Sequence, residues 1–239
     1  MPEPLDEFIM TRSPTPDRPL LGQTVLVIED SRFASEALRL LCLRSGARIR
    51  RADSLRAAAR HLAMYHPSVA IVDLGLPDGS GLDLIAELAA TNPRISVLMA
   101  TSADDNASGA ALEAGADGFL AKPVVSLAAF QAAILDHIPQ CDHPPGLRAL
   151  PDDVIAPDRL ALRDDLAHVA EVLTPDIDAN TARYVAQFVG GLAKTAKDTA
   201  LSEGARALQA SLGGKAPMMP AVVALQSLVK DRVRSAPIV

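Results

Sequence analysis

The chain has 239 residues and a formal net charge of −6, and 49% of its residues are apolar, 22% charged and 3% aromatic. This composition excludes general disorder, and the length has room for two domains of about 100 to 200 residues each. The acidic balance gives no electrostatic basis for generic binding to nucleic acid or anionic lipid.

The N-terminus and the cysteines bear on location. Residues 1–21 lack the basic start and apolar run of a signal peptide, and no segment approaches about 18 consecutive apolar residues. We interpret residues 1–21 as a flexible arm. Cys42 and Cys141 show neither CxxC nor Cys/His metal spacing, so no disulfide framework or zinc site is indicated. A cytoplasmic protein without a membrane segment is expected.

Short apolar runs alternate with longer amphipathic stretches between Thr24 and His137. The pattern predicts an α/β domain over residues 22–138, with a five-stranded, doubly wound parallel sheet between two layers of helices. The predicted strands are TVLVI, ARIR, VAIVD, ISVLMA and GFLA. The predicted helices, with apolar residues three and four apart, are residues 31–45, 54–65, 82–90, 106–114 and 126–137.

A different organisation is expected in the C-terminal part. Residues 139–157 are rich in proline and aspartate and lack periodicity, which is typical of a linker. Residues 158–239 show helical patterns at 158–173, 178–197, 199–212 and 217–234, which favour a small four-helix bundle. Charges nearly balance there, and no helix-turn-helix, phosphate-binding loop or catalytic set is recognisable. DNA recognition and a separate enzymatic domain are therefore disfavoured.

Three carboxylates follow two of the predicted strands. Glu29 and Asp30 come directly after the first strand, and Asp73 ends the third. Side chains at the carboxyl ends of neighbouring parallel strands converge on one crevice. Carboxylates without thiols or imidazoles suit a hard cation such as Mg²⁺, and the backbone carbonyl of Gly75 is a candidate additional ligand.

Two further polar residues are expected in the same crevice. Thr101 lies at the end of the fourth strand and Lys122 at the end of the fifth. A hydroxyl can hydrogen-bond a phosphoryl oxygen, and an ammonium group can neutralise its charge. Asp73 then has the nucleophile's role, because an ionised carboxylate can attack phosphorus without an external base.

The order of these motifs resembles the receiver domain of bacterial two-component response regulators. VLVIEDSRF carries the acidic pair, VAIVDLGLPDGSGLDLI the phosphoacceptor strand and loop, LMATS the hydroxyl position and GFLAKP the Lys-Pro ending. The resemblance implies a flavodoxin-like fold. It also implies that Asp73 takes phosphate from a histidine kinase or phosphotransfer protein, that Glu29 and Asp30 help hold Mg²⁺, and that Thr101 and Lys122 contact the phosphoryl group. Such a domain catalyses its own phosphoryl transfer and dephosphorylation.

The resemblance assigns two more positions. Phe119 occupies the aromatic switch position, where the ring is expected to turn inward as Thr101 moves toward the phosphate. Phe lacks the hydroxyl of the tyrosine that is also common there. The Lys122–Pro123 bond is a candidate cis peptide, a form accessible before proline.

Each feature also has an ordinary structural interpretation. Asp30 followed by Ser31 could cap a helix, and Phe119 could be a plain core aromatic. The basic run of Arg44, Arg48, Arg50, Arg51, Arg56 and Arg60 is spread over three predicted elements, which favours a solvated surface. His168 could accept phosphate within the bundle, but its neighbours DDLAHVAEVL form no recognisable phosphotransfer motif.

Three functional hypotheses follow. The leading one is a phosphorylation-controlled regulator that binds another signalling protein, or dimerises, through its helical domain. The second is a DNA-binding regulator, which requires salt-sensitive duplex binding. The third is a phosphorelay intermediate, which requires a second labile phosphate on a histidine such as His168.

Overall fold

The computed structural model describes residues 13–139, 143–145, 152–156, 158–214 and 217–235. Within them, the sheet has five parallel strands in the order β2-β1-β3-β6-β7. These strands are β1 (Thr24–Ile28), β2 (Arg48–Ala52), β3 (Val69–Asp73), β6 (Val97–Ser102) and β7 (Gly118–Ala121). The predicted doubly wound parallel α/β fold is confirmed, and the order places β1 beside β3, where the direction of winding reverses.

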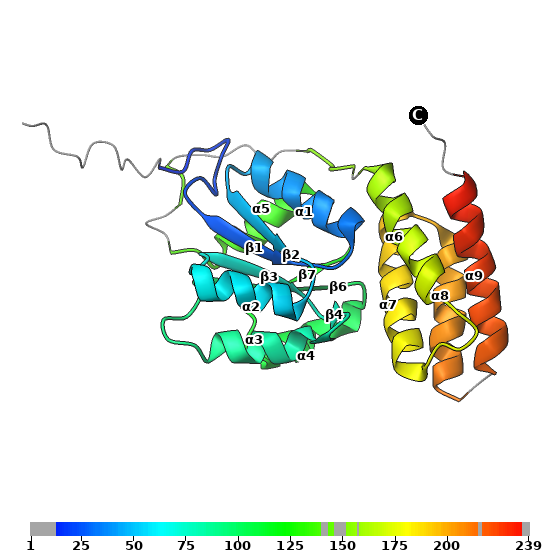
Figure 1. Cartoon of the computed structure of the whole chain (residues 1–239). Helices are drawn as coiled ribbons and strands as arrows, with labels where there is room; N and C mark the ends of the chain where they lie inside the picture. The colour runs from blue at the N-terminus through cyan, green and yellow to red at the C-terminus, as the bar shows by residue number, and fades with distance from the viewer. Residues whose placement is uncertain (1–12, 140–142, 146–151, 157, 215–216, 236–239) are drawn as a thin grey trace, which may run out of the picture.

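Helices cover both faces of this sheet (Figure 1). They are α1 (Arg32–Arg44), α2 (Leu55–Met64), α3 (Gly81–Ala89), α4 (Ser108–Glu113) and α5 (Leu127–Leu135). Val25 and Val27 of β1 pack on the face covered by α1 and α5, and Leu26 and Ile28 pack on the face covered by α2, α3 and α4. Both faces are buried because successive strand residues point in opposite directions, which explains the nearly continuous apolar runs.

Segments expected outside the α/β domain also pack against it. Leu20 and Ile155 are buried in the same core cluster, although they belong to the predicted arm and linker. Ile155 is held by a backbone hydrogen bond to Val125. Isolated apolar residues have no period, so the sequence pattern could not reveal this packing. The rest of the predicted arm, residues 1–12, lies outside the described residues, as do 140–142, 146–151 and 157 of the linker.

The C-terminal part contains four described helices, α6 (Arg159–Val172), α7 (Ala179–Ala196), α8 (Thr199–Leu212) and α9 (Met218–Ser235). They pack side by side around one apolar core, with α6 and α7 nearest the α/β domain (Figure 1). These boundaries lie within one residue of the predicted ones. No helix in the described part of the chain is both long and apolar enough to cross a membrane.

Candidate functional site

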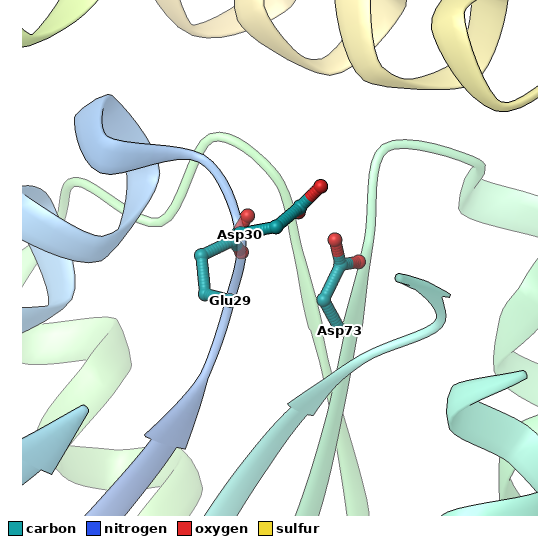
Figure 2. Close-up of side chains that lie close together, drawn as sticks. All are labelled: Glu29, Asp30 and Asp73. Atoms are coloured by element: carbon teal, nitrogen blue, oxygen red, sulfur yellow. The ribbon is translucent and has the colours of Figure 1, made fainter. Parts of the chain in front are cut away.

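The site lies at the carboxyl ends of β1 and β3, where the sheet changes its winding direction. Glu29 and Asp30 follow β1 and Asp73 ends β3, and the three carboxylates point out of the strand ends toward a helix of the C-terminal part (Figure 2). One oxygen of each carboxylate lies within 4.8 Å of the other two. The structure therefore brings together the three acidic residues that the sequence analysis placed in one crevice.

Ser31 leaves the Asp30 carboxylate available to this cluster. Ser31 is the N-cap of α1, and its hydroxyl accepts a hydrogen bond from the Ala34 N–H at 3.0 Å. The helix cap predicted as an alternative role for the Asp30–Ser31 pair is thus made by the serine.

Lys122 connects the two strand ends. Its Nζ lies 2.7 Å from Glu29 Oε2 and 2.9 Å from Asp73 Oδ2, and its side chain is only 10% exposed. A buried ammonium group between two carboxylates offsets part of their mutual repulsion. The structure therefore brings Lys122 next to Asp73, where the sequence analysis expects it.

Burial and proximity change the proton affinities of these groups. Burial raises the pKa of Glu29 to about 8, with Lys122 opposing the rise and Asp73 and Asp30 adding to it. Burial also raises the pKa of Asp30 to about 6, although a hydrogen bond from Tyr184 opposes it. Burial of Lys122 is outweighed by Asp73 and Glu29, which hold its pKa above the ordinary value. Among the described residues, the positive charge of Lys122 therefore does not fully offset the negative charge of the three carboxylates.

The donor set fits a hard divalent cation. Asp30 Oδ1 is buried and has no hydrogen-bond partner among the described residues, which is costly for a carboxylate oxygen. An ion bound by Glu29, Asp30 and Asp73 would give that oxygen a partner and favour the ionised carboxylates. Gly75, the other predicted ligand, lines the same cavity as Asp73.

The loop after β3 is held by pairing of its own two short strands and by hydrogen bonds to the start of α2. Its two short strands, β4 (Gly75–Leu76) and β5 (Gly79–Ser80), form an antiparallel turn. The Asp78 carboxylate accepts hydrogen bonds from the N–H groups of Leu55 and Arg56 at 2.8 and 3.0 Å. The first turn of α2 thereby anchors the loop that carries Gly75.

The remaining predicted site residues lie on β6, on β7 and directly after β7. Thr101 pairs with Asp73 across β3 and β6, but its hydroxyl donates to the Leu120 carbonyl at 2.8 Å. Phe119 is half-buried and packs against the core cluster beneath α2, α3 and α4. The Lys122–Pro123 peptide bond is cis.

Residues of the C-terminal helices also reach this site, which the sequence analysis did not anticipate. Tyr184 donates a hydrogen bond to Asp30 Oδ2 at 2.5 Å. Asp165 accepts hydrogen bonds from Ser31 Oγ at 2.8 Å and from the N–H groups of Arg32 and Phe33, both at 3.0 Å. In the sequence, Asp165 is only an acidic residue beside the apolar stripe of a predicted helix, and that position does not identify its partner.

Two further groups singled out in the sequence lie elsewhere. His168 is exposed on α6 and lines a groove that Asp30 and Tyr184 also line. The six arginines of the basic run are all exposed, at the end of α1, on β2 and on α2. Arg44 pairs with Asp153 at 2.7 Å, which is consistent with a solvated, mixed-charge surface.

Comparisons with known proteins address the α/β part. Residues 25–134 match the family model described as response regulator receiver domain. The KDP operon transcriptional regulatory protein KdpE of Escherichia coli is 33% identical over 99 residues, which are 41% of this chain and 44% of the relative. The virulence transcriptional regulatory protein PhoP of Salmonella typhimurium is 35% identical over 102 residues, 41% of this chain and 45% of the relative. The chain thus spans less than half the length of these relatives.

Among solved structures, a response regulator protein from Burkholderia pseudomallei is 29% identical, with a TM-score of 0.42 and coverage of 47% of this chain and 66% of that one. The receiver domain of a signal transduction histidine kinase from Syntrophus aciditrophicus is 24% identical, with a TM-score of 0.43 and coverage of 49% and 93%. The segment matched by the family model, with its five-stranded parallel sheet and its carboxylate cluster, is a response regulator receiver domain, and that model does not extend over α6–α9.

Proposed function

We propose that this protein is a two-component response regulator in which Asp73 accepts a phosphoryl group, with Mg²⁺ as cofactor, from a histidine kinase or phosphotransfer protein. The observation that carries the proposal is the buried cluster in which Lys122 Nζ bridges Glu29 and Asp73 and Asp30 completes the acidic set. A cytoplasmic location and the domain limits given above, 22–138 and 158–239, are part of the same proposal.

The chemistry follows from the positions of these side chains. An oxygen of the ionised Asp73 carboxylate attacks phosphorus, a new O–P bond forms, and the bond to the donor nitrogen or oxygen breaks with its electron pair leaving on the donor. Lys122 lies close enough to Asp73 to neutralise charge on the transferred group. Glu29, Asp30, Asp73 and the Gly75 carbonyl would hold Mg²⁺, which when bound offsets the charge of the phosphoryl oxygens.

Thr101 gives the proposed switch its structural basis. Its hydroxyl donates to Leu120 in the structure, so contact with a phosphoryl group on Asp73 requires rotation about its Cα–Cβ bond. Phe119, next to that carbonyl, would move with it and alter the surface near α4.

Phosphorylation of the purified full-length protein tests this proposal. The protein is incubated with Mg²⁺ and acetyl phosphate, and the intact mass and size-exclusion volume are followed. We expect one phosphoryl group on the wild type and none on Asp73→Asn. Asp53→Asn is the matched control, because Asp53 is an exposed carboxylate directly after the neighbouring strand β2 and should leave phosphorylation unchanged.

Further measurements on the phosphorylated protein distinguish the possible outputs. A shift in elution volume on phosphorylation supports dimerisation through the helical domain. The relatives carry the name transcriptional regulatory protein, so salt-sensitive binding to duplex DNA with sequence preference would favour the DNA-binding alternative. A second labile phosphate that disappears in His168→Gln would assign a phosphorelay role, since His168 lines the groove beside Asp30. Absence of phosphate from both the wild type and Tyr184→Phe, which lacks the hydroxyl that binds Asp30, would contradict the proposed function.

A further inference from the structure

Helix α7 forms one wall of the cavity at the phosphorylation site. Asp73, Glu29 and Lys122 line this cavity from the receiver domain, and α7 contributes Gln187, Phe188, Gly191, Leu192 and Thr195. Its volume is about 20 Å³, enough for about one water molecule. A Mg²⁺ ion that keeps several waters, together with a phosphoryl group, requires room for several groups of that size.

Two side chains of α7 contact groups that are candidate metal ligands. The Tyr184 hydroxyl donates a hydrogen bond to Asp30 Oδ2, which is one of the oxygens a cation would use. The Gln187 amide packs against Gly75 so closely that a Cβ at Gly75 would lie 2.3 Å from Gln187 Nε2. Both contacts use space or oxygen atoms that a bound cation and its waters would need.

Further contacts hold the bundle in this position. Asp165 of α6 caps the first turn of α1, and Phe33 of that turn is buried in the apolar core of the bundle. On the other side of the cavity, Lys194 donates to the Ala103 carbonyl at 3.1 Å and lies 2.9 Å from Asp105. The bundle is thus attached on both sides of the crevice.

We propose that the docked α6–α9 bundle is an autoinhibitory module that closes the receiver's phosphorylation site, and that α7 must leave the crevice before Mg²⁺ and a phosphodonor can enter. This inference rests on the proposed function of Asp73. The closed form has Tyr184 on Asp30, and the open form exposes the carboxylate cluster. Cation binding and phosphorylation shift the equilibrium to the open form, because the open form alone has room for both.

A disulfide between α7 and the receiver domain tests this directly. A Cβ at Gly191 would lie 3.7 Å from the Ala103 Cβ, within the range of about 3.5–4.5 Å found in disulfides. The pair Ala103→Cys/Gly191→Cys, made in a Cys141→Ser background, locks α7 over the crevice when oxidised and releases it when reduced.

A second disulfide provides a matched control within the bundle. A Cβ at Gly190 would lie 3.9 Å from the Ala205 Cβ on α8, so Gly190→Cys/Ala205→Cys ties α7 to its neighbour without attaching it to the receiver. Each protein is compared with its own reduced form, with Mg²⁺ affinity measured by calorimetry and phosphate by intact mass.

The oxidised lock of the Ala103→Cys/Gly191→Cys protein should slow phosphorylation and weaken Mg²⁺ binding by about tenfold or more, within the range usual for coupled sites, and reduction should restore both. The oxidised control pair should match its reduced form. Tyr184→Phe should have the opposite effect, with Mg²⁺ binding about tenfold tighter and faster phosphorylation, because it leaves Asp30 buried without that hydrogen bond in the closed form.

Equal phosphorylation of the oxidised and reduced lock would overturn the inference while leaving the proposed function intact. Equal slowing by the control disulfide would also overturn it, since stiffening of the bundle would then explain the effect. If neither the wild type, the reduced lock nor Tyr184→Phe gains phosphate, the proposed function is wrong. The Mg²⁺ titration alone then decides whether α7 blocks the carboxylate cluster.

Discussion

Among single residues, Glu29 shows most clearly how burial and charge compete in this site. Its carboxylate has a salt bridge of 2.7 Å to Lys122, yet its pKa is raised to about 8. The loss of solvent around a nearly inaccessible carboxylate outweighs one favourable contact when Asp30 and Asp73 lie beside it. Without a cation, the folded protein therefore binds a proton at Glu29 more tightly than the unfolded chain does.

This pKa predicts how stability changes with pH. A raised carboxyl pKa penalises the folded state as the pH rises from the unfolded value, 4.5, through about 8. Glu29→Gln removes that penalty, so in EDTA its melting temperature should rise relative to wild type by several degrees between pH 5 and pH 8. Mg²⁺ should reduce the difference by favouring the ionised Glu29. Thermal denaturation across this range gives the measurement, and a difference that stays flat or falls with pH would contradict the assignment.

At the scale of elements, helix α3 begins in close contact with the end of β3 that carries Asp73. α3 begins at Gly81, where a Cβ would lie 2.0 Å from the Asp73 carbonyl oxygen and 2.8 Å from the Leu74 Cα. These are backbone atoms, so they cannot move aside like the end of a flexible side chain. Glycine at this position lets the helix start directly against the strand end that carries the phosphoacceptor.

Alanine substitutions test this close approach. Gly81→Ala should lower the free energy of unfolding by about 1–3 kcal/mol and slow Asp73 phosphorylation, because the strand end must shift. Gly109→Ala is the matched control in α4, where a Cβ meets nothing within 4 Å. It should be neutral or stabilising by up to about 1 kcal/mol through helix propensity. Urea denaturation of both variants gives the comparison, and equal effects would show that space at Gly81 is not limiting.

At the scale of the whole molecule, the buried Asp165 carboxylate is one of the groups that join the two domains. Asp165 of α6 is buried and accepts three hydrogen bonds from the first turn of α1, while its neighbour Asp164 makes an exposed pair with Arg32 at 3.0 Å. Burial raises the pKa of Asp165, with the three hydrogen bonds opposing the rise. The contact matters because α1 begins right after Glu29 and Asp30, so the bundle supports the strand end that carries the acidic pair.

Asp165→Ala should therefore destabilise the protein by about 2 kcal/mol, since the helix end loses an acceptor and two buried donors lose their partner. Asp164→Ala should cost less than about 1 kcal/mol, as expected for a solvent-exposed ion pair. Differential scanning calorimetry of both variants gives the test. Similar losses would show that Asp165 contributes no more than a surface charge does.

The sequence alone determined the five-stranded parallel α/β fold, the helix boundaries and the residues that converge at the strand ends. These features depend on local periodicity and on one rule of parallel sheets, that neighbouring carboxyl ends meet at the same edge. Glu29, Asp30, Asp73 and Lys122 could be placed together because each is adjacent to a strand.

The tertiary structure alone decided where the bundle lies and which of its side chains face the receiver. Tyr184 and Asp165 are more than a hundred residues from their partners, and no period or motif connects them. Such contacts depend on how the two domains dock. Docking is decided by the shapes of the two surfaces and by the pairing of buried polar groups, neither of which local sequence patterns reveal. The packing of Leu20 and Ile155 escaped the sequence for the same reason, because single apolar residues carry no pattern.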